Sequence, residues 1–137
     1  MNGCVFCKIV NGDIKSWTVY EDDFVKSFFD VNPVSLGHTL VIPKKHFENL
    51  YDIPEDELCR VVSVARKLAH VYKKVLGIND VQILHSSGKN AQQDVPHFHI
   101  HLVPRKKGDG IDISYKSHPE WKGEFDATLQ KIKQSID

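Results

Sequence analysis

The longest regular pattern of apolar and polar positions lies between residues 52 and 77, in the segment DIPEDELCRVVSVARKLAHVYKKVLG. Apolar side chains recur there every three or four positions, which is the period of an α-helix with one buried face. Pro54 suits the first turn, acidic residues crowd the start, and Gly77 can cap the end. The pattern therefore predicts a long amphipathic helix. Its predicted buried stripe consists of Leu58, Val61, Ala65, Leu68, Tyr72 and Val75.

Shorter apolar runs bounded by turn residues are typical of strands. Trp17–Tyr20 and Phe24–Phe29 flank a turn and predict a hairpin. The other predicted strands span residues 38–42, 80–85 and 97–103. Short helices are predicted at 4–10 and at about 124–135. Because the strands are joined mostly by hairpins and one long helix crosses between them, the sequence predicts an α+β domain: an antiparallel β-sheet with one long helix and a short C-terminal helix.

Length, charge and cysteine content narrow the classes of protein. The 137 residues fit a single domain spanning the whole chain. The 18 basic and 18 acidic residues balance, so no broad positive surface for nucleic acid is predicted. No apolar run approaches the ~20 residues of a membrane span. Three cysteines without a secretion signal favour a cytoplasmic protein whose thiols stay reduced.

Three histidines stand at every second position in the segment DVPHFHIHLVPR: His97, His99 and His101. In an extended strand such residues project from one face about 6.5–7 Å apart, which separates the outer two by about 13 Å. One zinc ion, with Zn–N bonds of about 2.0–2.1 Å, cannot readily bind all three from a regular strand. We therefore expect the three histidines to have different roles.

A pair of cysteines, Cys4-x-x-Cys7, can supply two of the four ligands of a structural zinc site. Two histidine nitrogens from elsewhere in the chain would complete such a site, and His46 and His97 are the candidates. The alternatives are a redox pair and two small buried residues. A redox pair normally stands at the strand–helix junction of a βαβ unit, which this N-terminus does not resemble. The cysteine spacing alone leaves zinc and a metal-free pair open.

The central histidine, His99, is the candidate for covalent chemistry. A neutral imidazole with one nitrogen held by a hydrogen bond presents the other nitrogen as a nucleophile or base. The loop SSGKNAQQ (86–93) precedes it and can surround a phosphate with backbone N–H groups. The alternative for this loop is an ordinary polar hairpin connection.

Together these features resemble the histidine triad (HIT) family, whose motif is His-φ-His-φ-His-φ-φ with φ apolar. The segment HFHIHLV (97–103) matches the motif at every position. The resemblance covers about residues 4–105 and is to the zinc-containing bacterial and archaeal members of the nucleoside phosphoramidate hydrolase branch. In the C-terminal extension (106–137), the segment KKGDGIDISYKSHPEW resembles C-terminal extensions in that branch. The resemblance implies a HIT-like fold, a purine nucleotide or nucleotide conjugate as ligand, a structural zinc ion and a homodimer.

The resemblance also implies roles for individual residues. His99 matches the histidine that attacks the α-phosphate and becomes a transient nucleotidyl-histidine. His101 matches the histidine that contacts the phosphate, and His38 matches the histidine that faces it across the site. Asp30 matches the residue that bonds the ribose hydroxyls. The implied function is hydrolysis or transfer that releases a nucleoside monophosphate from a phosphoramidate or a related conjugate.

Larger sets of residues carry the remaining implied contacts. The zinc ligands of relatives match Cys4, Cys7, His46 and His97. The base-binding wall is expected from Phe6, Ile9, Phe28, Phe29 and Val31. Further contacts to the nucleotide are expected from Ser86, Gln93 and Asp94. Trp17 is expected to pack in the protein rather than to stack on a base.

Three positions depart from the family pattern near the proposed phosphate. Ser86 stands where relatives usually carry Asn or Gln, Gln92 stands where a glycine allows close backbone approach, and Asp94 stands where Ser, Thr or Glu is common. These changes bear on which leaving group the protein accepts and on the rate of the reaction. Two alternatives therefore stand beside the phosphoramidate hydrolase: a dinucleoside polyphosphate hydrolase, and a nucleotide-binding interaction protein with little turnover.

Overall fold

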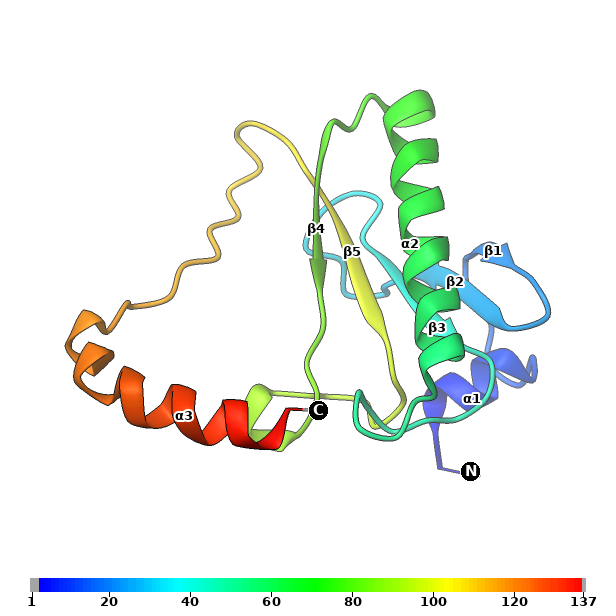
Figure 1. Ribbon diagram of the computed structural model, residues 1–137. Helices are drawn as coiled ribbons and strands as arrows, with labels where there is room; N and C mark the ends of the chain where they lie inside the picture. The colour runs from blue at the N-terminus through cyan, green and yellow to red at the C-terminus, as the bar shows by residue number, and fades with distance from the viewer. Residues whose placement is uncertain (1–2, 137) are drawn as a thin grey trace.

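The computed structural model describes residues 3–136, and these form a five-stranded antiparallel sheet with helices on both of its faces (Figure 1). The strand order is β1-β2-β3-β5-β4. This architecture confirms the predicted α+β class with an antiparallel sheet and one long helix. The elements are α1 (Val5–Val10), β1 (Thr18–Glu21), β2 (Val25–Phe29), β3 (Thr39–Pro43), α2 (Glu55–Leu76), β4 (Asp80–Leu84), η1 (Lys89–Ala91), β5 (Ile100–Arg105), η2 (Pro119–Glu124) and α3 (Phe125–Ser135).

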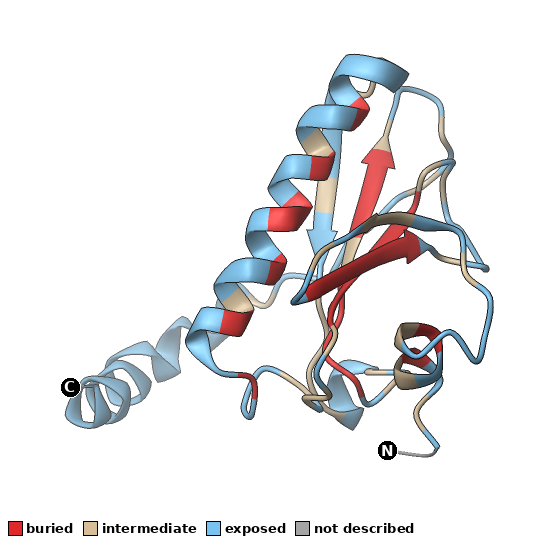
Figure 2. Ribbon diagram, turned by 90° about the vertical axis from the view of Figure 1, so that its right-hand side faces the viewer, coloured by how far each residue is buried: buried red, intermediate tan, exposed pale blue. Residues whose placement is uncertain are grey.

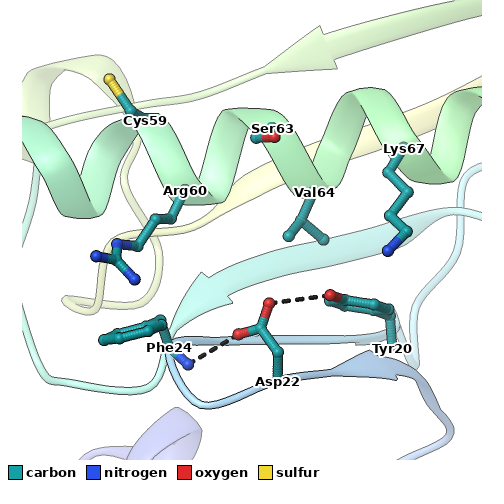
Figure 3. A pocket seen from close by; sticks show the side chains of 8 residues that line it. All are labelled: Tyr20, Asp22, Phe24, Cys59, Arg60, Ser63, Val64 and Lys67. Carbon is teal, nitrogen blue, oxygen red and sulfur yellow. Dashed lines mark hydrogen bonds between the residues drawn. The ribbon is translucent and has the colours of Figure 1, made fainter.

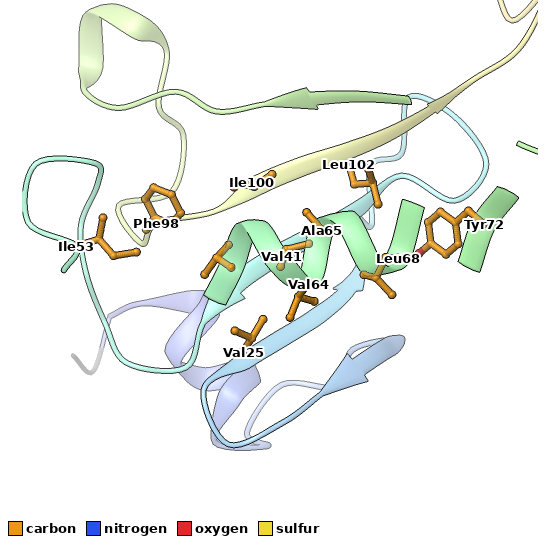
Figure 4. Packing of buried hydrophobic residues seen from close by; sticks show 11 residues of the cluster. Val25, Val41, Ile53, Val64, Ala65, Leu68, Tyr72, Phe98, Ile100 and Leu102 are labelled. Carbon is orange, nitrogen blue, oxygen red and sulfur yellow. The ribbon is translucent and has the colours of Figure 1, made fainter. Parts of the chain in front are cut away.

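The helix α2 covers one face of the sheet, and its buried residues form a stripe that faces the strands (Figure 2). Gly77 ends the helix in the left-handed conformation, at φ +69°, as predicted. The buried stripe packs against strand residues such as Val25 and Val41 (Figure 4). Val75 was wrongly predicted to be buried and is 63% exposed, because the last turn of α2 extends past the surface that it covers. The predicted residues that are buried are Val61, Ala65, Leu68 and Tyr72.

The opposite face of the sheet carries α1 and the histidines. Successive side chains of a strand point to opposite faces, so in β3 Val41 packs under α2 whereas Leu40 and Ile42 pack with Phe6 of α1. His101 lies directly across from Leu40 in the pairing of β3 with β5, and paired residues share a face. The histidine site therefore lies on the face of the sheet away from α2.

The histidine strand begins later than predicted. β5 starts at Ile100, so His97 and His99 precede it on irregular backbone. The backbone N–H of Phe98 donates to a loop carbonyl at 2.6 Å rather than to a neighbouring strand. The spacing of a regular strand therefore does not apply, and the ring centroids of His99 and His101 lie 5.0 Å apart. The division of roles among the histidines follows from their individual contacts instead.

The C-terminal extension stands away from the sheet. Residues 106–118 form no helix or strand and lead to η2 and α3, which lie apart from α2 and the sheet in Figure 1. Several large apolar residues of this extension are exposed: Trp121, Phe125, Leu129, Ile132 and Ile136. Among residues 3–136, no helix combines the length and the apolar character that crossing a membrane requires.

Candidate active site and metal centre

Four metal-binding side chains converge beside α1. Cys4 caps the first turn of this helix, where its sulfur accepts a hydrogen bond from the backbone N–H of Cys7 at 3.4 Å. His46, in the loop after β3, and His97 bring their Nδ1 atoms to the same point, 3.2 Å apart. The Cys7 sulfur lies 3.4 Å from the Nδ1 of His46 and 3.6 Å from that of His97. The Cys4 sulfur lies 3.4 Å from the Nδ1 of His97.

These separations suit a tetrahedral zinc ion. Zn–N bonds of about 2.0–2.1 Å and Zn–S bonds of about 2.3 Å place neighbouring ligand atoms roughly 3.3–3.8 Å apart. The Nε2–H of His97 donates to the carbonyl of Pro43 at 2.9 Å, which leaves the lone pair of Nδ1 directed into the cluster. Burial lowers the pKa of His97 to about 4, so its ring is neutral, as a metal ligand must be. The donor set, its distances and this outer hydrogen bond all fit zinc.

The second histidine of the row, His99, lies next to this cluster, and each of its ring nitrogens faces an oxygen atom. Its Nδ1 lies 2.8 Å from the backbone carbonyl of His97, and because a carbonyl only accepts, Nδ1 carries the proton. In the neutral ring the lone pair is therefore on Nε2. Phe6 packs edge-on against the ring at a centroid distance of 5.2 Å. An imidazole fixed in this way can act as a nucleophile or a base.

The third histidine, His101, ends a directed chain of hydrogen bonds. The backbone N–H of Val34 donates to Nδ1 of His38 at 3.1 Å, so the proton of the neutral His38 ring is on Nε2. That Nε2–H donates to Nδ1 of His101 at 2.9 Å, which leaves His101 with its proton on Nε2. Burial lowers the pKa of His38, and it lowers the pKa of His101 to about 4, so both rings are neutral near pH 7. This series of hydrogen bonds therefore ends in the Nε2–H group of His101, which is free to donate.

A carboxylate borders the same pair of histidines. Oδ2 of Asp30 lies 3.6 Å from Nε2 of His38 and 4.0 Å from Nδ1 of His101, so the three groups are close enough to share a cation. One proton already lies between the two ring nitrogens, however, and His38 cannot release it without losing the Val34 contact. The cluster is therefore a hydrogen-bonding site rather than a metal site.

A cavity of about 460 Å³ adjoins His38 and Asp30. Its lining residues are Trp17, Phe29, Asp30, Val31, Pro33, Ser35, Leu36, Gly37 and His38. Trp17 and Val31 are 59% and 70% exposed, so the cavity has apolar walls that are open to solvent. Trp17, which was expected to pack in the protein, lines this cavity instead. Its cavity position depends on the pairing of β1 with β2, which sequence spacing does not reveal.

The remaining residues predicted to form the base-binding wall do not line this cavity. Phe6, Ile9 and Phe28 are buried in a second hydrophobic cluster beneath α1. The strand alternation explains this difference, because Phe28 points to the α1 face while its neighbour Phe29 is 40% exposed at the cavity. The structure therefore brings only Phe29 and Val31 of the predicted wall to the cavity.

The loop between β4 and β5 is organised by one of its own side chains. The amide of Gln93 accepts a hydrogen bond from the N–H of Gly88 at 2.8 Å and donates to the carbonyls of Glu48 and Val95. Its amide thus shapes the loop, whereas its contact with a nucleotide stays a prediction. Gln92 has φ +67°, a left-handed conformation that costs a side-chain-bearing residue about 1–2 kcal/mol.

Two other residues of the predicted site occupy different environments. Ser86 is half-buried and is separated from the end of β4 by His85. Asp94 is at the site, with Oδ1 3.3 Å from Nε2 of His99 and a side chain that is 73% exposed. An anionic carboxylate therefore contacts the one ring nitrogen that is free to react.

A further cavity, of about 360 Å³, lies on the α2 face of the sheet (Figure 3). Its charged groups are already paired within the protein. Asp22 accepts hydrogen bonds from the Tyr20 hydroxyl and the Phe24 N–H. Arg60 and Lys67 lie over the rings of Phe24 and Tyr20, 3.6 and 4.7 Å from their centroids. No histidine lines it, so the chemistry is assigned to the opposite face.

Residues 11–108 match the HIT domain family. An uncharacterised HIT-like protein of Methanocaldococcus jannaschii is 44% identical over 130 residues, covering 95% of this chain and 98% of the relative. An adenosine 5'-monophosphoramidase of Saccharomyces cerevisiae is 37% identical over 134 residues, covering 97% and 80%. An adenylylsulfatase of Arabidopsis thaliana is 37% identical over 108 residues, covering 79% and 55%.

Among solved structures, a zinc-bound histidine triad family protein of Mycobacterium smegmatis superposes with a TM-score of 0.78. It is 34% identical, and the match covers 98% of this chain and 99% of that protein. A bound zinc ion is thus known in a protein with this fold.

Proposed function

This chain belongs to the HIT domain family, and from that premise we propose that it hydrolyses nucleoside 5'-phosphate conjugates, with a phosphoramidate as the preferred substrate. The observation that carries the proposal is the pair of ring nitrogens at the site. In its neutral form the His99 ring holds a lone pair on Nε2, and the neighbouring His101 carries its proton on Nε2. A nucleophile beside a hydrogen-bond donor is the arrangement that phosphoryl transfer requires.

In the proposed reaction, Nε2 of His99 attacks the α-phosphorus and the bond to the leaving group breaks. The electron pair of that bond goes to the leaving nitrogen, which takes a proton from solvent and departs as an amine. The positive charge that develops on the ring is stabilised by the hydrogen bond from Nδ1 to the carbonyl of His97. The Nε2–H of His101 donates to an equatorial phosphate oxygen, where negative charge develops. Water then attacks the nucleotidyl-histidine and loses a proton to solvent, which releases the nucleoside monophosphate and returns the electron pair to Nε2 of His99.

The cavity next to His38 suits the nucleoside part of such a substrate. Trp17, Phe29 and Val31 offer apolar surface for a base, and aromatic faces stack on any base. Oδ1 of Asp30 accepts a hydrogen bond from the backbone N–H of Asn32, and the carboxylate has further lone pairs that can accept from ribose hydroxyls. Ser86, Gln93 and Asp94 then belong to the loop on the leaving-group side.

The four ligands Cys4, Cys7, His46 and His97 are proposed to hold a structural zinc ion. When bound, zinc would supply a cross-link between α1, the loop after β3 and the segment that carries His97. These residues thereby fix the backbone next to His99 without taking part in the reaction.

A second copy of the chain is the proposed partner of the C-terminal extension. β4 is an edge strand, with Val81 37% and Ile83 48% exposed, and an open edge can pair with another strand. The apolar side of α3 is also exposed, at Leu129 and Ile132. Light scattering coupled to size-exclusion chromatography tests this, because removal of residues 119–137 should weaken or abolish a dimer.

One observation favours a second candidate function, a nucleotide-binding protein with little turnover. The Asp94 carboxylate, 3.3 Å from Nε2 of His99, repels an incoming phosphate and competes for the nucleophile. The names of the phosphoramidase and adenylylsulfatase relatives favour turnover instead. The dinucleoside polyphosphate hydrolase remains a third possibility to be tested beside them.

The decisive experiment compares wild type with His99→Ala and with His70→Ala, a matched control on the exposed side of α2. Each protein receives adenosine 5'-phosphoramidate or a diadenosine polyphosphate, and AMP release is measured. Base-quenched samples are examined by intact mass for a nucleotidyl adduct, since a phosphorus–nitrogen bond to histidine is labile in acid. Phosphoramidate turnover that disappears only in His99→Ala supports the proposal. Binding of AMP without turnover or adduct selects the nucleotide-binding protein, and preference for the dinucleotide selects the third function.

A further inference from the structure

The residue proposed as nucleophile lies on backbone that the sheet does not hold. β5 begins at Ile100, and its ladder pairs Leu84 of β4 with His101. The carbonyl of His99 therefore lies just outside the ladder, where a buried polar group needs another partner. That partner is a side chain: Nδ1 of His85 lies 2.8 Å from the His99 carbonyl oxygen.

The direction of this hydrogen bond follows from its neighbours. The backbone N–H of Leu50 donates to the Ser87 hydroxyl oxygen at 2.9 Å, and that hydroxyl also contacts Nε2 of His85. A carbonyl only accepts, so His85 carries a proton on Nδ1, and in the neutral ring its Nε2 accepts the hydroxyl proton of Ser87. The result is a directed chain from Leu50 through Ser87 and His85 to His99. Each donor in it has one acceptor.

Packing holds the ring of His85 in the same position. The ring lies against that of Phe98, with centroids 4.5 Å apart and an interplanar angle of 31°. Phe98 is 1% exposed and belongs to the core under α2. The His85 ring is thus fixed by the core on its face and by hydrogen bonds at both nitrogens, as a rigid support for another residue requires.

From this geometry we propose that His85 is a positioning residue for the histidine that attacks phosphorus. The peptide unit between His99 and Ile100 is oriented by His85, and the ring of His99 is oriented by the carbonyl of His97. Backbone and side chain of His99 are therefore fixed from two sides, which directs its Nε2. The inference rests on the proposed function, in which His99 is the nucleophile. A displacement of about 1 Å at such an atom costs about a hundredfold in rate.

Two variants of His85 separate the donor from the bulk of the ring. His85→Leu keeps apolar contact with Phe98 but removes the N–H. His85→Asn keeps an N–H at the same place, because Nδ2 of Asn and Nδ1 of His both bond to Cγ. His70→Leu is the control for replacing an exposed histidine.

The kinetic result expected with adenosine 5'-phosphoramidate is a split between kcat and KM. His85→Leu should lower kcat by about 10- to 100-fold while KM changes less than about threefold, since the nucleoside cavity is untouched. His85→Asn should retain at least about a third of the kcat. Wild-type kcat in a folded His85→Leu protein overturns the proposal, as does an equal loss in both variants. If His85→Leu does not fold, Ser87→Ala is used instead. A smaller loss of kcat is expected in that variant, and an unchanged kcat overturns the proposal.

Nitrogen-15 NMR of the imidazole rings gives a test that does not depend on turnover. His85 should carry a proton on Nδ1, and the His99 signals should match wild type in His85→Asn but shift in His85→Leu. A proton on Nε2 alone of His85, or unchanged His99 signals in His85→Leu, overturns the proposal. If wild type releases no AMP, the proposed function fails on its own, and these signals still decide whether His85 positions His99.

Discussion

Replacing His101 by glutamine should remove a specific part of the protein's acid sensitivity. Burial lowers the pKa of His101 from 6.5 to about 4. Between these two values the unfolded chain binds a proton at this ring and the folded chain does not. The free energy of unfolding therefore falls as the pH drops through that window. Above pH 6.5 the protein has the full stability associated with a neutral His101. His101→Gln lacks the ionisable ring, and its amide oxygen can still accept from Nε2 of His38.

The size of the effect follows from the two pKa values. At pH 4 an unfolded-state pKa of 6.5 and a folded-state pKa near 4 lower the stability of wild type by at most about 3 kcal/mol. The side chain of His101 is 25% exposed, so solvent keeps the loss below this bound. The variant should therefore gain stability relative to wild type, by up to about 3 kcal/mol, as the pH falls from 7 to 4.

Urea denaturation followed by circular dichroism at pH 7, 5.5 and 4.5 measures this difference. Loss of any bound zinc at low pH affects both proteins alike and cancels when wild type and variant are compared. Two curves of stability against pH that run parallel would refute the argument that His101 is held neutral by burial. A variant that becomes less stable relative to wild type on acidification would refute its sign.

Three further predictions concern the ribose contact, the metal and the loop. Asp30→Asn should raise KM for adenosine 5'-phosphoramidate by at least about tenfold with little change in kcat, because a lost charged hydrogen bond costs about 1.5–3 kcal/mol of binding. An unchanged KM in steady-state assays argues against the ribose contact. The double variant Cys4→Ser, Cys7→Ser should contain no stoichiometric zinc by elemental analysis and should melt at a lower temperature than wild type. If wild type is purified without metal and a chelator does not change its melting temperature, the zinc site is excluded. Gln92→Gly should stabilise the protein by up to about 1 kcal/mol in urea denaturation by relieving the left-handed backbone at φ +67°, and destabilisation would contradict that account.

Local patterns were sufficient for most of the secondary structure. The helical period located α2, and Gly77 marked its end, because a residue without a Cβ adopts the left-handed conformation at little cost. The start of β5 was predicted three residues too early. Alternation of apolar side chains continues through His97 and His99, but the hydrogen-bond ladder that defines a strand depends on where the neighbouring strands end.

The sequence by itself determined the chemical inventory of the site: two cysteines and two histidines able to hold a metal, and the HIT motif that contains His99. The tertiary structure decided which of these groups meet and in which protonation pattern. Only the folded chain puts the carbonyl of His97 against His99, the N–H of Val34 against His38, and His85 against the histidine segment. A ring nitrogen becomes donor or acceptor through the partner that it faces, and that partner is set by packing between segments distant in the chain. Residue spacing carries no record of those partners.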